Sequence, residues 1–245
     1  MDIHVEQASL HWQHHCVFSN LNLDLPAGQW TSILGQSGVG KSSLVQLLCG
    51  IADEAEVQGK ILCSDGQPLA GRVAWMAQQD LLLPWLNLAD NVLLGARLQH
   101  NRKPSTEQRE LAFYLLQQVG LGDRASELPA RLSGGQRQRV ALARTLFQDR
   151  PLVCMDEPFS ALDAITRLRL QDLAAELLAR QTVLMITHDP LEALRLSDRI
   201  LVLRGTPAQL SDPILPAGSA PRPVQDPDLL QQQAQLLSLL AEETP

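Results

Sequence analysis

The sequence predicts an α/β fold with a mainly parallel sheet that is covered by helices on both faces. Short apolar runs alternate with helix-forming segments toward both ends of the chain, and this order is typical of a parallel sheet. The middle of the chain, residues 88–148, is mostly helical, so we expect a helical subdomain inserted into the core. A chain of 245 residues is long enough for one such domain with its insertion.

The first half of the chain carries clear strand and helix signals. Leu21, Leu23 and Leu25 alternate with polar residues, which is the period of a half-buried strand. Residues 41–49 are predicted to form a helix, and Gly50 is well placed to cap its C-terminus. The other expected strands in this half are residues 3–12, 30–34, 57–63 and 72–77.

Within the helical middle, Ser105 and Gln108 have the spacing of a capping box. After it, strand and helix signals alternate again along the chain. Six prolines between residues 206 and 227 predict a linker or an extended surface segment. A short C-terminal helix is expected because apolar residues recur at helical spacing at Leu230, Ala234, Leu237 and Ala241. The remaining expected strands are 152–155, 182–187 and 199–204, and the remaining expected helices are 164–180 and 190–196.

Composition excludes some classes of function. The chain has 27 acidic and 20 basic residues, a net charge of −7, which argues against a dedicated nucleic-acid binder. Its four cysteines form no CxxC pair and have apolar neighbours, so buried free thiols in a reducing compartment are expected. No secretory signal is visible, and no apolar run approaches the ~20 residues of a membrane helix.

A phosphate-binding loop is predicted between the strand at residues 30–34 and the helix that follows. The stretch matches GxxxxGK[ST], and glycines allow backbone N–H groups to wrap around phosphate oxygens at the start of a helix. Lys41 supplies a charge for the β- and γ-phosphates, and the Ser42 hydroxyl is a natural Mg²⁺ ligand. The expected cofactor-binding residues here are Gly35, Gln36, Ser37, Gly38, Val39, Gly40, Lys41, Ser42 and Ser43.

Two acids follow the apolar run at residues 152–155. Ligands in open α/β sheets bind at the carboxyl ends of strands, so Asp156 is expected to reach the metal and Glu157 to polarise an attacking water. The alternative is that both acids only begin a loop. The phosphate loop earlier in the chain favours the functional interpretation.

A third motif, residues 132–136 with the sequence LSGGQ, makes the family recognisable. Together with the phosphate loop before it and the acid pair after it, this motif resembles the ATP-binding-cassette (ABC) ATPases over residues 3–204. The resemblance implies a P-loop NTPase fold, with a RecA-like core and a small antiparallel β part, over residues 1–205. Residues 206–245 would then be a proline-rich linker and a short helix.

The resemblance also implies roles for individual residues. Trp12 would stack on adenine, Gln78 would contact Mg²⁺ and the attacking water, and His188 would lie near the γ-phosphate. Gln79 is an adjacent alternative to Gln78. Residues 160–163 would cross a dimer interface. The motif residues expected to bind ATP are Ser133, Gly134, Gly135 and Gln136.

In the family, two such chains face each other and hold ATP between the phosphate loop of one and the LSGGQ motif of the other. The implied cofactors are ATP and Mg²⁺. The implied partners are a second copy of this chain, membrane permease subunits and, indirectly, a solute-binding protein, but no nucleic acid. The chain would lie peripherally on the cytoplasmic face of the inner membrane.

Two classes of function compete for this ATPase. The run from Leu81 to Leu86, with Pro84 and Trp85, resembles importers of the nitrate, sulfonate and taurine group and their thiamine-pyrimidine-precursor relatives. The alternative is a soluble ABC-type ATPase that acts on ribosomes or DNA, which commonly carries two cassettes or a coiled-coil insertion. Neither feature is present in this sequence, so an importer subunit is favoured. An exporter is a third possibility that the proline–tryptophan run disfavours.

Overall fold

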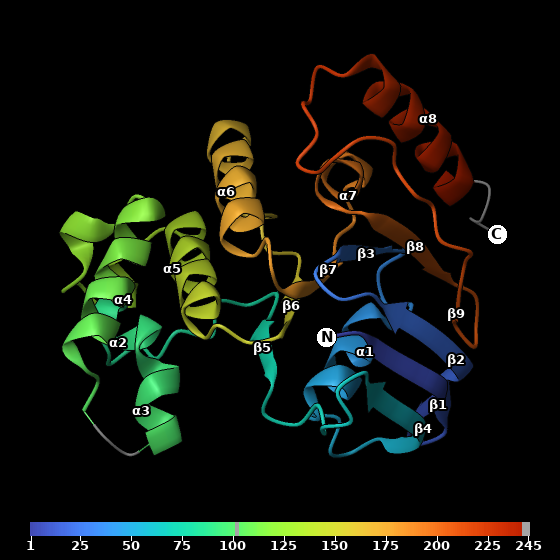
Figure 1. Cartoon of the computed structure of the whole chain (residues 1–245), viewed down its shortest axis with the longest axis horizontal. Coiled ribbons are helices and arrows are strands. Elements are labelled where there is room, and N and C mark those ends of the chain that lie inside the picture. Colours follow the sequence, from blue (N-terminus) through green and yellow to red (C-terminus); the bar gives the residue numbers. More distant parts are fainter. Residues whose placement is uncertain (101–102, 242–245) are drawn as a thin grey trace.

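Two β-sheets form the frame of the molecule in a computed structural model that describes residues 1–100 and 103–241 (Figure 1). The smaller sheet is antiparallel and has the strand order β2-β1-β4. Its strands are β1 (Ile3–Trp12), β2 (His15–Leu25) and β4 (Glu56–Cys63). The α/β fold with a small antiparallel part is thereby confirmed.

The larger sheet has the strand order β5-β6-β7-β3-β8-β9, and its first five strands are parallel. They are β5 (Val73–Met76), β6 (Leu152–Asp156), β7 (Thr182–Ile186), β3 (Trp30–Leu34) and β8 (Arg199–Arg204). The short β9 (Gln209–Leu210) runs antiparallel to β8. The three central strands β6, β7 and β3 are buried along their whole length, as expected for parallel strands covered on both faces.

The helix α1 (Lys41–Cys49) lies between the two sheets and ends at Gly50, which adopts the left-handed conformation of a C-terminal cap. Its apolar residues share one core with both sheets; Leu44 and Leu48, for example, pack in the same cluster as Phe18 of β2 and Cys154 of β6. This packing fixes the start of α1, and therefore the preceding loop, against the end of β6.

Four α-helices of the described residues lie between β5 and β6 in the chain and gather on one side of the molecule, away from the antiparallel sheet (Figure 1). They are α2 (Leu88–Val92), α3 (Leu94–His100), α4 (Thr106–Gln118) and α5 (Gly134–Phe147). The capping box predicted at Ser105 and Gln108 is present. Buried residues of α2, α4 and α5 join those of β5, β6 and β7 in one apolar core, so the helices are packed against the sheet.

The remaining α-helices of the described residues are α6 (Ala164–Leu177), α7 (Pro190–Leu196) and α8 (Pro227–Ala241). The predicted helix at residues 164–180 therefore ends three residues early. Within the part of the chain that the structure describes, each helix is too short or too polar to cross a membrane.

The proline-rich stretch before α8 is an extended surface segment that is fixed to the core. Arg222 is 4% exposed, and its guanidinium donates hydrogen bonds to five carbonyl oxygens at 2.6–3.0 Å. Two of these carbonyls, from Leu194 and Ser197, lie at the C-terminal end of α7. The segment is thus tied to the end of a helix of the core.

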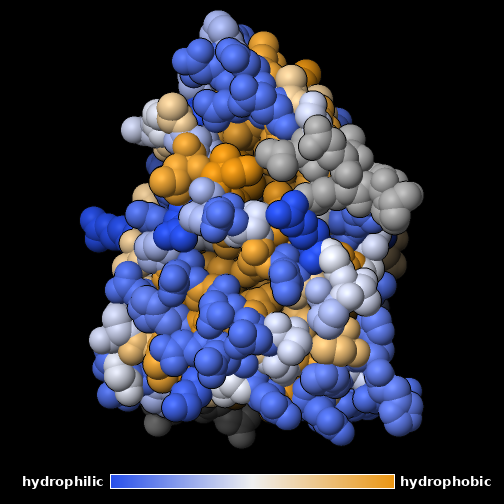
Figure 2. Space-filling model, turned by 90° about the vertical axis from the view of Figure 1, so that its right-hand side faces the viewer, coloured by the Kyte–Doolittle hydropathy of each residue, from blue (hydrophilic) through white to orange (hydrophobic). Residues whose placement is uncertain are grey.

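The helix α8 packs on α7 through Leu229 and Leu236, which are buried with residues of β3 and β8. Leu230 and Leu237, which helped to predict the helix, lie on its outer side and are 50% and 48% exposed. Figure 2 views this side of the molecule and shows apolar surface between hydrophilic residues.

Candidate functional site

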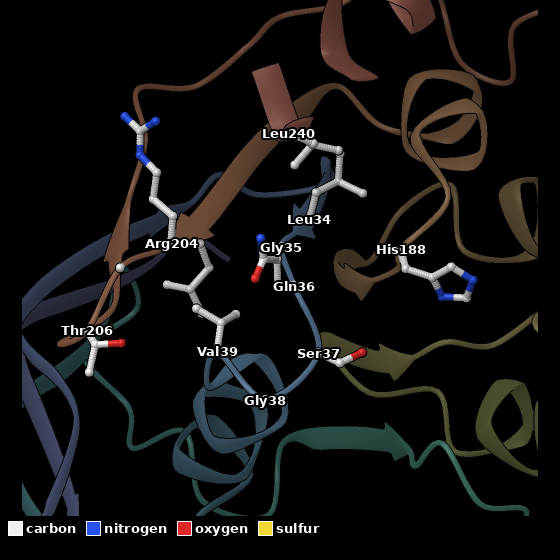
Figure 3. Close-up of a pocket in the computed structure, with 12 residues that line it drawn as sticks. Leu34, Gly35, Gln36, Ser37, Gly38, Val39, His188, Arg204, Thr206 and Leu240 are labelled. Carbon is white, nitrogen blue, oxygen red and sulfur yellow. The ribbon is translucent and has the colours of Figure 1, made fainter. Parts of the chain in front are cut away.

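The glycine-rich loop between β3 and α1 lines a cavity of about 630 Å³ (Figure 3). Gly35 and Gly40 have φ values of +155° and +112°. A Cβ on Gly35 would lie 2.4 Å from the carbonyl oxygen of Leu203, and a Cβ on Gly40 would lie 2.4 Å from Val17. Only glycine satisfies the backbone conformation and the close approach at these two positions.

Lys41 is the first residue of α1, and its side chain folds back against the loop. Its Nζ donates hydrogen bonds to the carbonyl oxygens of Gly35 and Gln36 at 2.7 and 2.8 Å, and the residue is 8% exposed. Burial lowers the pKa of Lys41, while the negative charges of Glu157 and Asp156 oppose that change. The ammonium group is therefore placed where it can meet an anion that enters the loop.

Ser42 and Asp156 bring the loop and the end of β6 together. The Ser42 hydroxyl donates a hydrogen bond of 2.7 Å to Asp156 Oδ2, and Asp156 is 6% exposed. Burial raises the pKa of Asp156, although the Ser42 hydrogen bond lowers it. A hydroxyl and a carboxylate are oxygen ligands of the type that Mg²⁺ prefers, so these two residues fit a magnesium site.

Three side chains converge where β5, β6 and β7 end. Glu157 Oε2 accepts a hydrogen bond from Gln78 Nε2 at 3.3 Å, and Glu157 Oε1 lies 3.2 Å from His188 Nδ1. Glu157 has a φ of +49°, which is uncommon for a residue with a side chain. Its amide donates to the carbonyl oxygen of Ile186 at 2.9 Å, which anchors this conformation to β7. The contact made by Gln78 favours it over Gln79.

Trp12 ends β1 and is half-buried. Its indole Nε1 donates to the Ser43 hydroxyl at 3.4 Å, so the ring lies beside the first turn of α1. Among the described residues that line the 630 Å³ cavity, Trp12 is absent and Leu240 of α8 is present.

The motif at residues 133–136 begins α5. The Ser133 hydroxyl accepts a hydrogen bond from the Gln136 amide at 3.3 Å, and Gln136 Oε1 accepts one from the Ser133 amide at 2.9 Å. Gly134 lines a different cavity, of about 410 Å³, together with Gln78. In the described chain the structure thus assembles the loop, the acid pair, Gln78 and His188, while residues 133–136 stay outside the 630 Å³ cavity.

Comparison with known proteins decides the family. The sequence model described as "ABC transporter" matches residues 18–160, more than half of the chain. This chain belongs to the ABC transporter family. It is an ATP-binding, ATP-hydrolysing cassette, which confirms the resemblance, the fold and the enzymatic activity expected from the sequence.

Full-length relatives support the assignment. The chain is 49% identical over 244 residues to an uncharacterized ABC transporter ATP-binding protein of Haemophilus influenzae, across 98% of this chain and 99% of the relative. It is 41% identical to the aliphatic sulfonates import ATP-binding protein SsuB 2 of Burkholderia cenocepacia, across 90% of this chain and 80% of that protein. It is 46% identical to SsuB 1 of Rhodococcus jostii, across 76% and 73% of the two chains.

Solved structures agree with the fold. The cassette MJ0796, in a dimeric post-hydrolysis state bound to ADP and Pi, has a TM-score of 0.76 and 27% sequence identity. The match covers 89% of this chain and all of that one. A putative metal-chelate type ABC transporter in an inward-facing conformation matches with a TM-score of 0.70 and 28% identity, across 85% and 82% of the two chains.

The sequence did not single out Gln138, which links the start of α5 to the acid pair of this cassette. Its Nε2 donates to the Glu157 carbonyl oxygen at 2.9 Å, and its Oε1 accepts from the Ala161 amide at 2.9 Å. Gly135 passes close to the same loop, because a Cβ there would lie 2.8 Å from the Ala161 carbonyl oxygen. A glutamine in a polar helix gives no signal of such a contact in the sequence.

Two arginines of α5 were also missed, and they bind the segment after Gln78. Arg137 Nε donates to Asp80 Oδ2 at 2.9 Å. Arg144 donates to the carbonyl oxygens of Asp80 and Leu81 at 2.6 and 2.8 Å, and burial lowers its pKa. The segment that carries Gln78 is thus fixed both to the sheet and to the helical side of the cassette.

Proposed function

We propose that this cassette powers a membrane importer of a small solute, as a peripheral subunit on the cytoplasmic face of the inner membrane. The SsuB import relatives support import, and the separation of the LSGGQ motif from the phosphate loop supports the action of two copies together. Ser133 and Gly134 of the motif are exposed and lie outside the loop's cavity, so a complete site needs a second copy. The dimeric structures of the similar cassette MJ0796 support such a pairing of two copies.

Within one copy, the loop would cradle the phosphates. The amides at residues 36–40 and the start of α1 favour a polyphosphate, and Lys41 would supply charge to the β- and γ-phosphates. Trp12 would stack on adenine beside Ser43, where its ring already lies. Glu157 would orient and polarise the attacking water, with Gln78 and His188 holding its carboxylate at 3.3 and 3.2 Å.

Ser42, Asp156 and Gln78 would hold Mg²⁺. When bound, the ion would neutralise phosphate charge during phosphoryl transfer. A cation at this position would also offset the burial that raises the pKa of Asp156. Because Gln78 also contacts Glu157, a change near Gln78 would reach the residue that acts on water.

ATP would act as the contact between two copies. Ser133, Gly134, Gly135 and Gln136 of the second copy would meet the γ-phosphate through backbone donors at the start of α5. The closed dimer would gain these contacts only while ATP is intact. Hydrolysis would remove them, so the population would shift to the open dimer.

The permease subunits would dock beside Gln78. The residues that follow it, through Leu81, line the 410 Å³ cavity, and Trp85 is 71% exposed. An exposed indole four residues after a segment that lines a cavity suits a contact with another protein. A permease bound here would act on Glu157 through Gln78.

The solute would be of the sulfonate, taurine or nitrate class, or a thiamine pyrimidine precursor. The SsuB relatives, which are aliphatic sulfonates import proteins, favour a sulfonate. A solute-binding protein would select it and pass it to the permease.

Affinity purification from detergent-solubilised membranes tests the proposal. A tagged chain is expected to retain a membrane permease. Trp85→Ala should lose it, while Trp12→Ala, which changes the end of β1 beside α1, should keep it. Identifying the permease and its binding protein then allows radiolabelled sulfonate uptake to be measured. Recovery with ribosomes or nucleic acid instead of a permease would contradict the proposal.

A further inference from the structure

Two loops of the candidate site each lead directly into a helix. Residues 160–163 follow Glu157 and lead into α6, and the Asp163 carboxylate caps that helix by accepting from the Thr166 amide at 3.0 Å. His188 precedes α7, and the Asp189 carboxylate accepts from the Leu191 amide at 2.9 Å. A fixed contact between α6 and α7 therefore fixes the two loops relative to each other.

The contact between α6 and α7 is polar and buried. Gln171 Nε2 donates to Glu192 Oε1 at 3.0 Å, and Gln171 Oε1 accepts from Arg195 Nη1 at 3.0 Å. Gln171, Glu192 and Arg195 are 2%, 5% and 7% exposed. A shift of either helix would break these hydrogen bonds between buried groups, so the contact specifies one arrangement.

The contact continues into the loop that carries His188. Burial raises the pKa of Glu192, and hydrogen bonds from the Thr187 hydroxyl and from Gln171 oppose that rise. The same Thr187 hydroxyl accepts from the Asp189 amide at 3.1 Å. The Glu192 amide also donates to the Asp189 carboxylate at 3.4 Å, so Glu192 is tied to the residue immediately after His188.

Arg167 of α6 joins the two loops a second time. Its Nη2 donates to the Leu162 carbonyl oxygen at 3.1 Å, and its Nη1 lies 3.5 Å from Asp189 Oδ2. A small cavity of about 40 Å³ has Glu157, His188, Arg167 and Glu192 in its wall. The α6–α7 contact thus lies directly behind the two groups that would act on ATP.

We propose that Gln171 and Glu192 are positioning residues for ATP hydrolysis, which hold His188 and Glu157 in a fixed relation to residues 160–163. Those residues are the segment that a second copy would contact in the ATP-bound dimer. The inference rests on the proposed function, which gives Glu157 and His188 their roles. Gln171 and Glu192 act through the two loops and make no contact with nucleotide.

A set of three variants tests the proposal in the full-length chain. Gln171→Leu removes both hydrogen bonds. In the exchanged pair, Gln171→Glu with Glu192→Gln, the carboxylate at position 171 can accept from Arg195 and from the amide at position 192, so both hydrogen bonds can form again. Glu176→Gln, an exposed change on the same helix, is the matched control. Each protein is measured for kcat, for ATP affinity and for hydrogen exchange at the Asp189 amide.

Gln171→Leu should lower kcat about tenfold, which corresponds to a rise of about 1.4 kcal/mol in the barrier, while the Kd for ATP changes less than about twofold. Hydrogen exchange at the Asp189 amide should accelerate. The double variant Gln171→Glu with Glu192→Gln should recover the native kcat and the native rate of hydrogen exchange, and the control should match the native chain. Unchanged kcat or unchanged hydrogen exchange at the Asp189 amide in Gln171→Leu would overturn the inference, as would an exchanged pair that recovers neither property. Failure of the chain to retain a permease would contradict the proposed function, while the kcat and hydrogen-exchange data would still decide the inference.

Discussion

The Ser42 hydroxyl donates a hydrogen bond of 2.7 Å to a carboxylate oxygen of Asp156, although the two residues are 114 positions apart in the sequence. The packing of α1 between the sheets brings them together. Ser42→Ala would remove one proposed Mg²⁺ ligand and leave the buried Asp156 without this donor. We expect ATP affinity in the presence of Mg²⁺ to fall at least about tenfold. Calorimetric titration with Mg²⁺ and with EDTA checks this, and an equal loss in both conditions would contradict the assignment.

Lys41→Ala should abolish productive ATP binding, because the ammonium is the only side-chain charge described within the loop that carries Gly35 and Gln36. The fold should persist, since Lys41 contributes hydrogen bonds to the loop and not to the apolar core. Fluorescent-nucleotide binding and circular dichroism measure the two properties. Normal hydrolysis by a folded Lys41→Ala protein would refute the loop's assignment.

Arg222→Ala should detach the proline-rich segment from α7. Five carbonyl oxygens would lose their common donor, and we expect the free energy of unfolding to fall by about 3 kcal/mol. Urea denaturation measures the loss. Arg180→Ala, an exposed change, serves as the control and should alter stability by less than about 0.5 kcal/mol. Equal stability of the two variants would show that Arg222 does not hold the segment.

Glu192→Gln should change how stability depends on pH. Burial raises the pKa of Glu192 above its ordinary value of 4.5 in the folded chain. As pH rises above 4.5, the unfolded chain loses this proton first, so the native protein loses stability until the raised pKa is passed. The glutamine variant lacks this loss and should gain stability relative to the native chain over that interval. Parallel stability curves for the two proteins, measured by urea denaturation from pH 4 to 8, would contradict the expectation.

Much of this site follows from the sequence because its residues lie next to strand ends. Asp156 follows an apolar run, and His188 follows another, so a parallel sheet brings both to one edge. Gln78 joins them because β5 pairs with β6. Spacing along the chain therefore predicts which residues meet once the sheet is parallel.

Other features depend on tertiary contacts that periodicity does not encode. Along α8, Leu229 and Leu236 are seven residues apart, as are Leu230 and Leu237, so the pattern predicts a helix but not which pair is buried. Gln138 and Arg222 look like ordinary polar residues. Their roles arise from carbonyl oxygens of distant segments, which only the folded chain brings within reach.

The Glu157→Gln variant provides the most direct test that two copies enclose ATP. It should bind ATP with Mg²⁺ but hydrolyse it far more slowly, because the amide cannot polarise the attacking water. Light scattering in the presence of ATP and Mg²⁺ should then give twice the chain mass of 26.9 kDa, and the added change Gly134→Arg, at a position with room for a side chain, should prevent that doubling. A Glu157→Gln protein that is saturated with ATP and keeps the mass of a single chain would contradict the account.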